Sequence, residues 1–332
     1  MTNRQAPWWT AITLAVICLV VSPAAAAAAT LYVDASNATG VENGTPDHPY
    51  STINAAVLEA ASGDTIRVAP GTYSEDVTID SMALKLLGDD PATTTIRGFS
   101  NVVLVTGTFT PGADVVEIAG FTITMGATAG VHVDSGTAKV SVHNCILSSN
   151  FNGVLVNRGG IANVYNNIVM DSANVGLRAN DGSRLSCTNN ILMNNKYAAY
   201  SYNSSIVSCS NNTFVGNATN CDCSKNYSGR CTSTYSCPAA NNSFEEDCLF
   251  VDLAASDLRL QSGSPCIDAG SSFPADNDPD GTRNDKGVYG GPGAAGFWPT
   301  PAGSPVVTEL SVTPHDVPLG GTLTVTAKGT AR

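Results

Sequence analysis

The chain reads VSVHNCILSSNFNGVLVNRGG at residues 140–160, and the pattern returns in the segments that follow: ANVYNNIVMDSANVGLRANDGS (162–183), LSCTNNILMNNKYAAYSYNSS (185–205) and VSCSNNTFVGN (207–217). Asparagine marks the register, because Asn144, Asn166, Asn189 and Asn211 are separated by 22, 23 and 22 residues. A fixed period of this length is typical of a solenoid, in which each repeat buries its apolar face by stacking on its neighbours. The sequence therefore predicts an all-β parallel β-helix of about eight coils.

Alternation within the repeats predicts the core. Successive side chains on a strand point to opposite faces, so three inward columns follow: Val131/Val154/Leu177/Ala199, Val133/Val156/Ala179/Ser201 and Val142/Val164/Cys187/Cys209. The aligned asparagines come just after the third column, at a turn. Stacked amides there can bond to one another along the axis and to the turn backbone. We interpret this asparagine ladder as architecture and not as a ligand site.

The same alternation predicts two outward columns on one face. The first contains His132, Leu155, Arg178 and Tyr200, and the second contains Asp134, Asn157, Asn180 and Tyr202. Tyrosine rings stack on sugar rings, while amide, carboxylate and guanidinium groups bond to hydroxyls. The columns therefore form a candidate sugar-binding face, with an ordinary solvated sheet face as the alternative.

The segments around the repeats predict the remaining organisation. Residues 30–64 contain a strand and a short helix with Ile53, Val57 and Ala60 on one face. Ser51 or Thr52 can cap this helix and Gly63 can end it, so that it covers the first core layer. The coils occupy residues 65–250, with a Cys-rich insertion at 221–248. A closing segment (251–297), a Pro-containing linker (298–305) and the first two strands of a second β module (306–332) complete the chain.

Composition and the N-terminus bear on the compartment. Residues 1–29 have the apolar core and small-residue end of a signal peptide, with an uncleaved membrane anchor as the alternative. No later segment is apolar enough to span a membrane. The net charge of −12 disfavours nucleic acid as a partner. We expect a monomer that is secreted or held at the cell surface.

Cysteine usage agrees with export. Nine cysteines follow the signal peptide, and six lie in one stretch: Cys221, Cys223, Cys231, Cys237, Cys248 and Cys266. In an exported protein these predict disulfides more strongly than a zinc site. Cys187 and Cys209 share a register in adjacent coils, which suits either a disulfide or two buried thiols. The odd count leaves at least one thiol unpaired.

An Asp-rich loop in the closing segment is a candidate Ca²⁺ site. Asp276, Asp278 and Asp280 alternate before Gly281, and Asn284 follows. Hard oxygen ligands at every other position and a glycine turn suit calcium. Gly287 stands where a helical calcium-binding loop carries its glutamate, so that version is excluded, and an acidic turn without metal is the alternative.

Two stretches resemble a known group. LYVDASNATG…GTPDHPYSTINAAV…ASGDTIRVAPGTY resembles the opening of secreted right-handed parallel β-helix proteins of the pectin-lyase-like superfamily. The tail DLRLQSGSPCIDAG…DNDPDGTRNDKGVYGGP looks like the closing segment of bacterial surface and secreted β-helix proteins, and the last strands resemble the start of an immunoglobulin-like module. The resemblance implies the fold over roughly residues 31–293.

The superfamily includes polysaccharide lyases, glycosidases, esterases, epimerases and proteins without known catalysis. Its lyases use an Arg or Lys base, and Ca²⁺ or a further basic group neutralises the uronate carboxylate. Arg178 matches that role as base or clamp, with Arg158 and Lys196 nearby, but no acidic cluster accompanies it. The paired aspartates of the glycosidases are also missing. We therefore expect an exported protein that binds or processes polysaccharide, with a non-catalytic surface scaffold or adhesin as the alternative.

Overall fold

The computed structural model describes residues 28–110, 115–223, 234–236, 241–298, 305–313 and 324–331. The predicted signal peptide lies almost wholly outside the described residues. None of the described helices has the length and apolar character needed to cross a membrane.

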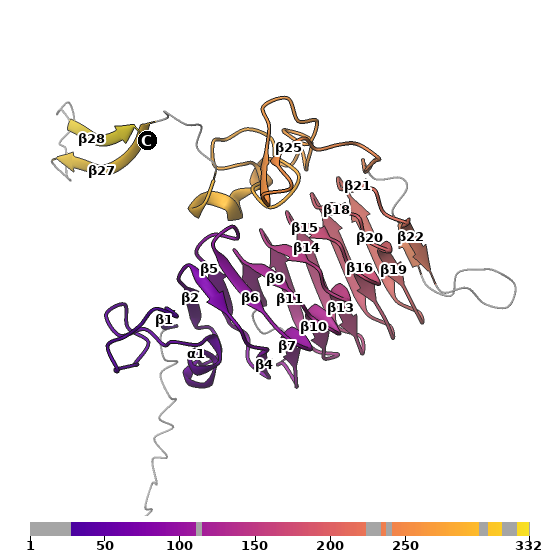
Figure 1. Ribbon diagram of the computed structural model, residues 1–332, viewed down its shortest axis with the longest axis horizontal. Coiled ribbons are helices and arrows are strands. Elements are labelled where there is room, and N and C mark those ends of the chain that lie inside the picture. The colour runs from indigo at the N-terminus through magenta and orange to yellow at the C-terminus, as the bar shows by residue number, and fades with distance from the viewer. Residues whose placement is uncertain are drawn as a thin grey trace, which may run out of the picture.

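Three parallel sheets run the length of the molecule, and the chain visits them in rotation (Figure 1). Sheet 1 consists of β1 (Thr30–Val33), β2 (Thr65–Val68), β5 (Lys85–Gly88), β8 (Val116–Ala119), β11 (Lys139–His143), β14 (Ile161–Tyr165), β17 (Arg184–Thr188), β20 (Ile206–Ser210) and β23 (Thr234–Ser236). Sheet 2 consists of β4 (Val77–Asp80), β7 (Asn101–Thr106), β10 (Ala129–Asp134), β13 (Asn152–Asn157), β16 (Val175–Ala179), β19 (Tyr197–Ser201) and β22 (Thr219–Cys223). Sheet 3 consists of β3 (Gly71–Tyr73), β6 (Thr94–Arg97), β9 (Thr122–Thr124), β12 (Ile146–Ser148), β15 (Ile168–Met170), β18 (Ile191–Met193), β21 (Thr213–Val215) and β24 (Ser243–Phe244).

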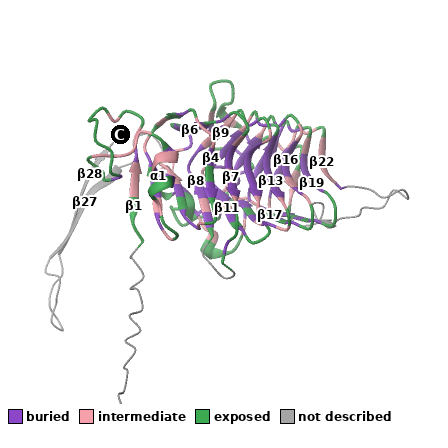
Figure 2. Cartoon of the chain, turned by 90° about the horizontal axis from the view of Figure 1, so that it is seen from below, coloured by how far each residue is buried: buried purple, intermediate pink, exposed green. Residues whose placement is uncertain are grey.

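The fold is the predicted parallel β-helix, but it makes about seven full turns and not the expected eight, because its shortest sheet has seven strands. Each inward column has the predicted register: Val131 pairs with Val154, Val154 with Leu177, and Leu177 with Ala199. These residues belong to one continuous apolar core, which Figure 2 shows as buried strands along the axis. The third column ends in a Cys187–Cys209 disulfide with its Cα atoms 4.6 Å apart.

The asparagine ladder is wider than predicted. In the predicted column, Asn189 donates to Asn166 Oδ1 at 3.4 Å. A second column, one residue further on, has shorter bonds along the axis, because the distances from Asn167 to Asn190 and from Asn190 to Asn212 are both 3.0 Å. The aligned Asn144, Asn166, Asn189 and Asn211 also hold the turn between sheets 1 and 3, with φ values of 49°, 52°, 59° and 56°. Asparagine tolerates this left-handed conformation better than other non-glycine residues, which explains its recurrence there.

Helix α1 (Ile53–Glu59) packs against β1, β2 and β4, and its buried Ile53, Ala56 and Val57 join the core as predicted for a cap. Thr52 is the N-cap, since its hydroxyl accepts from the Ala55 amide. The sequence predicted that Gly63 ends this helix. That prediction is wrong, because the extended Ala60 already terminates the helix.

The Cys-rich stretch continues the coils before it departs from them. Strand β22 pairs with β19, β23 with β20 and β24 with β21, so the insertion is narrower than residues 221–248. Cys221 and Cys223 are disulfide-bonded. At the C-terminus, β27 (Pro305–Thr313) and β28 (Thr324–Ala331) form the antiparallel pair that the alternation predicts.

The closing segment folds back over the solenoid and covers the outer face of sheet 3 (Figure 1). Its hairpin β25 (Phe250–Asp252) and β26 (Asp257–Leu260) is followed by the short helices η1 (Pro274–Asp276) and η2 (Pro292–Gly296). Leu258 and Val288 pack with the outward Ile146, Ile168 and Ile191, and a Cys248–Cys266 disulfide lies in the same cluster. This second core fixes the segment on the coils.

The turn asparagines fasten the other edge of the closing segment. The Asn144 amide donates to the carbonyls of Val288 and Gly290 at 2.8 and 2.9 Å. Asn166 donates to Asp285 O at 2.8 Å, and Asn189 Oδ1 accepts from the Ser271 amide at 2.8 Å. Gly293 lies so close to Asn144 that a Cβ would overlap its side-chain oxygen. The repeated asparagine therefore makes both the turn and the docking surface.

Candidate functional site

The outer face of sheet 2 brings the two predicted columns together. His132 pairs with Leu155, Leu155 with Arg178, and Arg178 with Tyr200. Asp134 pairs with Asn157 in the neighbouring column. Asn180 and Tyr202 directly follow their strands and bond back to the preceding coil. All seven candidate residues therefore lie on one face, as the period predicts.

Hydrogen bonds link these side chains across the coils. His132 Nδ1 lies 3.0 Å from Asn101 Oδ1, and its Nε2 lies 2.8 Å from the Asn157 amide nitrogen. Asn157 Oδ1 in turn accepts from Asn180 at 3.0 Å. With an amide donating to Nε2, the imidazole is neutral and carries its proton on Nδ1. Burial lowers the pKa of His132, which keeps the ring in that form.

Arg178 is held by its neighbours on this face. Its Nε donates to Asn180 Oδ1 at 3.0 Å, and its guanidinium carbon lies 5.8 Å from the centre of the Tyr200 ring. It forms no ion pair with any residue that the structure describes. Its terminal nitrogens are therefore available to an acceptor on a ligand, and the guanidinium fork suits a carboxylate.

The charged residues near Arg178 have different surroundings. Arg158 Nε pairs with Asp134 at 3.0 Å, so those two charges neutralise each other. Lys196 is exposed, and its Nζ lies 5.9 Å from the centre of the Tyr197 ring. Asp222 lies on the next strand, β22, where it pairs with Tyr200 of β19 and extends the first column. The aligned repeats end one coil before Asp222, so this residue was not among the predicted ones, although the stretch TNCDC continues the alternation.

The four predicted metal ligands do not form one site, because only Asp278 belongs to a cluster of carboxylates. Asp278 is buried, and its carboxylate lies within 4.8 Å of those of Asp268 and Asp285, a group that can hold a metal ion. Asp280 accepts from the hydroxyl and the amide of Thr282. Asn284 donates to the backbone carbonyl of Asp276. Asp278 is therefore the one predicted ligand in the group, and alternation along the loop could not reveal Asp268 or Asp285.

Burial controls the charge of the cluster formed by Asp268, Asp278 and Asp285. Burial raises the pKa of Asp278 to about 7 and that of Asp285 to about 6. Asp278 accepts from the amides of Gly291 and Asp285 at 2.5 and 2.9 Å, and Asp285 accepts from the Asp268 amide at 2.7 Å. The pair thus ties three parts of the closing segment together, and it carries a proton near neutral pH unless a cation replaces it.

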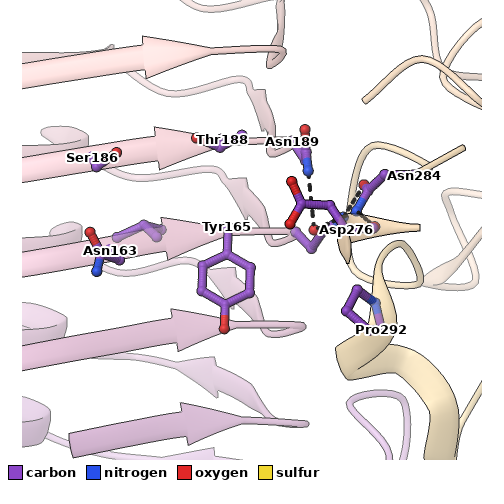
Figure 3. Close-up of a pocket in the computed structure, with 10 residues that line it drawn as sticks. Asn163, Tyr165, Ser186, Thr188, Asn189, Asp276, Asn284 and Pro292 are labelled. Atoms are coloured by element: carbon purple, nitrogen blue, oxygen red, sulfur yellow. Dashed lines mark hydrogen bonds between the residues drawn. The ribbon is translucent and has the colours of Figure 1, made fainter. Parts of the chain in front are cut away.

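A separate groove lies between the outer face of sheet 1 and the closing segment (Figure 3). Its cavity has a volume of about 390 Å³, and its lining includes Asn163, Tyr165, Ser186, Asp276 and Pro292. Figure 3 shows Asn163 and Ser186 on one side of Tyr165, and Asp276 and Pro292 on the other. Asp276 thus faces sheet 1, whereas Asp268, Asp280 and Asp285 line a different cavity, beside sheet 3.

Comparison with known proteins identifies the fold. Residues 95–244 match the family model described as a right handed beta helix region. A crystal structure of the pectate lyase Pel9A is similar with a TM-score of 0.40 and 14% identity, over 78% of this chain and 96% of that chain. No curated protein matches the chain. The three parallel sheets and the match over residues 95–244 together show that the chain folds as a right-handed parallel β-helix.

Proposed function

We propose that the protein is exported and binds an acidic polysaccharide along the outer face of sheet 2. The observation that carries this proposal is Arg178, a cation oriented by Asn180 and Tyr200 without an ion-pair partner among the described residues. A uronate carboxylate accepts two bonds from such a guanidinium, while Tyr200 and Tyr202 offer rings to the sugar. Successive strands place equivalent groups about 4.8 Å apart, which suits an extended chain.

Binding without catalysis fits Arg178 better than a lyase reaction does. An arginine that acts as a lyase base must first lose a proton from its guanidinium, and nothing on the sheet 2 face of the described residues favours that loss at Arg178. Arg178 also donates from Nε and lies by a tyrosine ring, which are contacts of a cation. The group of three aspartates lies in the closing segment and not on sheet 2. These observations favour a clamp.

Export is supported by two disulfides, Cys187–Cys209 and Cys248–Cys266, because such bonds persist in oxidising compartments. The second candidate function, a surface scaffold or adhesin, is favoured by the antiparallel pair β27–β28 that follows the coils. In that role the β-helix would act as a rigid spacer. The two functions differ in whether the sheet 2 face has a ligand of its own.

We also propose that the cluster of three aspartates in the closing segment binds Ca²⁺ in a structural role. Asp268, Asp278 and Asp285 supply hard oxygen ligands. The two positive charges of one Ca²⁺ would replace the proton that the buried pair otherwise carries, and the ion would stabilise the closing segment at neutral pH. These aspartates belong to the closing segment, and Asp268 and Asp285 line the cavity beside sheet 3, so the expected effect of the ion is on stability.

Affinity electrophoresis of the full chain through gels containing polygalacturonate, alginate or a neutral glucan tests the binding proposal. We expect retardation by at least one uronate polymer, and Arg178→Ala and Tyr200→Ala should each weaken it by about tenfold or more, since each removes a contact worth over about 1 kcal/mol. Retardation unchanged by both substitutions would contradict the proposed face. No retardation by any polymer would favour the scaffold.

A parallel ultraviolet assay for unsaturated product, with and without Ca²⁺, separates binding from cleavage. We expect no product, because Arg178 is a clamp. Product that disappears in Arg178→Ala but persists in Arg184→Ala would establish a lyase and contradict the non-catalytic reading. Arg184 begins β17 on sheet 1 and is exposed, so it matches the change of charge without touching sheet 2.

A further inference from the structure

The groove between sheet 1 and the closing segment has the architecture of a built pocket. Its floor comes from β14 and β17, and its wall comes from the segments around Asp276 and Pro292. The two walls are far apart in sequence but are fixed by bonds from Asn166 to Asn284 and Asp285 at 2.9 and 2.8 Å. A cavity of about 390 Å³ is large enough for one or two sugar rings, at the lower end of ligand pockets.

An aromatic ring in the groove is fixed in place before any ligand arrives. Tyr165 stacks on His143 with their ring centres 4.7 Å apart and an angle of 10° between the planes. His143 is itself held, because its Nε2 lies 3.1 Å from Glu117 and its Nδ1 lies 2.8 Å from Asn144 Oδ1. Burial raises the pKa of Tyr165 to about 12, so its phenol remains a hydrogen-bond donor at neutral pH.

Several polar groups at the groove have no partner within the described part of the chain. They are the side-chain amide of Asn163, the hydroxyl of Ser186, the phenol of Tyr165 and the carboxylate of Asp276. Asn163 and Ser186 are neighbours on paired strands, so they form a row beside the ring. An aromatic surface, hydroxyl and amide groups and one carboxylate together can bond the alternating donors and acceptors of a sugar.

The charge of the groove selects the class of sugar. Asp276 is the only carboxylic acid among the lining residues, and no Lys, Arg or His is among them. The hydrogen bond from His143 lowers the pKa of the nearby Glu117 to about 2, but this carboxylate pairs with Lys85 at 3.0 Å, so the unpaired negative charge at the groove is that of Asp276. An anionic sugar would be repelled here, whereas a carboxylate accepts from two neighbouring hydroxyls of an uncharged one.

We propose that the groove between sheet 1 and the closing segment binds an uncharged saccharide unit, through the Tyr165 ring and the carboxylate of Asp276. This site is separate from the sheet 2 face and takes a sugar of different charge. It is formed partly by the closing segment, so the segment both seals the solenoid and completes the site. The protein would then hold two sugar chains, or two parts of one mixed chain, on different faces.

Calorimetric titration of the full chain with neutral glucose, mannose and xylose oligosaccharides tests this proposal, with a galacturonate oligosaccharide as the charged counterpart. We expect at least one neutral oligosaccharide to bind, and its affinity to fall about tenfold in Tyr165→Ala and Asp276→Asn. Ser186→Trp, which fills the groove from an exposed position, should abolish binding. Arg178→Ala should leave it unchanged.

The proposal of a saccharide site in the groove is overturned if no neutral oligosaccharide binds, or if binding survives both Ser186→Trp and Asp276→Asn. The carboxylate of Asp276 has no described partner and Ser186 is exposed, so neither variant should disturb folding. Loss of neutral binding in Arg178→Ala would place the ligand on sheet 2 instead. Because the sheet 2 proposal is tested with uronates, failure of either proposal leaves the other standing.

Discussion

At the scale of single residues, His132 shows how a polar group is accommodated on a nearly buried sheet face. Both ring nitrogens have partners, Asn101 on one side and Asn157 on the other. The sequence placed this histidine among possible ligand contacts. Its role as a ligand contact stays a prediction, and its hydrogen bonds connect it through Asn157 and Asn180 to the Nε of Arg178.

We predict that His132 stays neutral at physiological pH with its proton on Nδ1. Burial lowers its pKa below the usual value, and the Asn157 amide bonds only to an unprotonated Nε2. Nitrogen-detected NMR of the imidazoles checks this against the His132→Gln variant for assignment. A titration midpoint above that of an unstructured histidine peptide would contradict it.

The turn asparagines allow a second test at this scale. Asn144 and Asn211 share the left-handed turn, but Asn144 also donates two bonds to the closing segment. Asn144→Ala should therefore lower the free energy of unfolding by about 2 kcal/mol more than Asn211→Ala, since it leaves buried carbonyls unpaired. Denaturant unfolding of both variants measures the difference. Equal losses would mean that the turn alone explains the repeated asparagine.

At the scale of elements, the closing segment is the part whose stability should depend on pH and calcium. The folded pKa values of Asp278 and Asp285, about 7 and about 6, lie above the value of about 3.9 in an unfolded chain. The folded state therefore binds more protons. The stability from this pair is fully present below about pH 4 and is lost as pH rises through about 6 to 7.

We predict that, with a chelator present, the melting temperature falls between about pH 5 and about pH 7.5, and that Ca²⁺ restores it at the higher pH. Asp278→Asn should weaken both effects, because it removes one of the two titrating carboxyls and a ligand together. Calorimetric melts of the two proteins provide the comparison. An equal response to Ca²⁺ in Asp278→Asn would place the ion elsewhere.

At the scale of the whole molecule, most of the solenoid could be predicted from its period. Regular strand spacing sets the register, so the columns through Val131, His132 and Val142 follow from alignment alone. The prediction missed the second asparagine column, because the sequence shows only that asparagines recur as pairs in three of the four repeats. Which member turns inward depends on the left-handed φ of the first one.

The sites formed by the closing segment could not be predicted in the same way. Its contacts join residues more than a hundred positions apart, such as Asn166 and Asn284, and no period relates them. The alternation of Asp276, Asp278 and Asp280 suggested one metal loop, but the backbone sends these side chains in different directions. The groove on sheet 1 depends on the same docking and has no signal in sequence.

The most direct test of the central claim, that sheet 2 binds an acidic sugar chain through Arg178, is a calorimetric titration of the full chain with a galacturonate oligosaccharide. Arg178→Ala and Arg184→Ala remove the same charge from different faces. We predict that affinity falls about tenfold or more in Arg178→Ala and stays within about twofold in Arg184→Ala. Equal affinities in the two variants would show that sheet 2 is not the binding face.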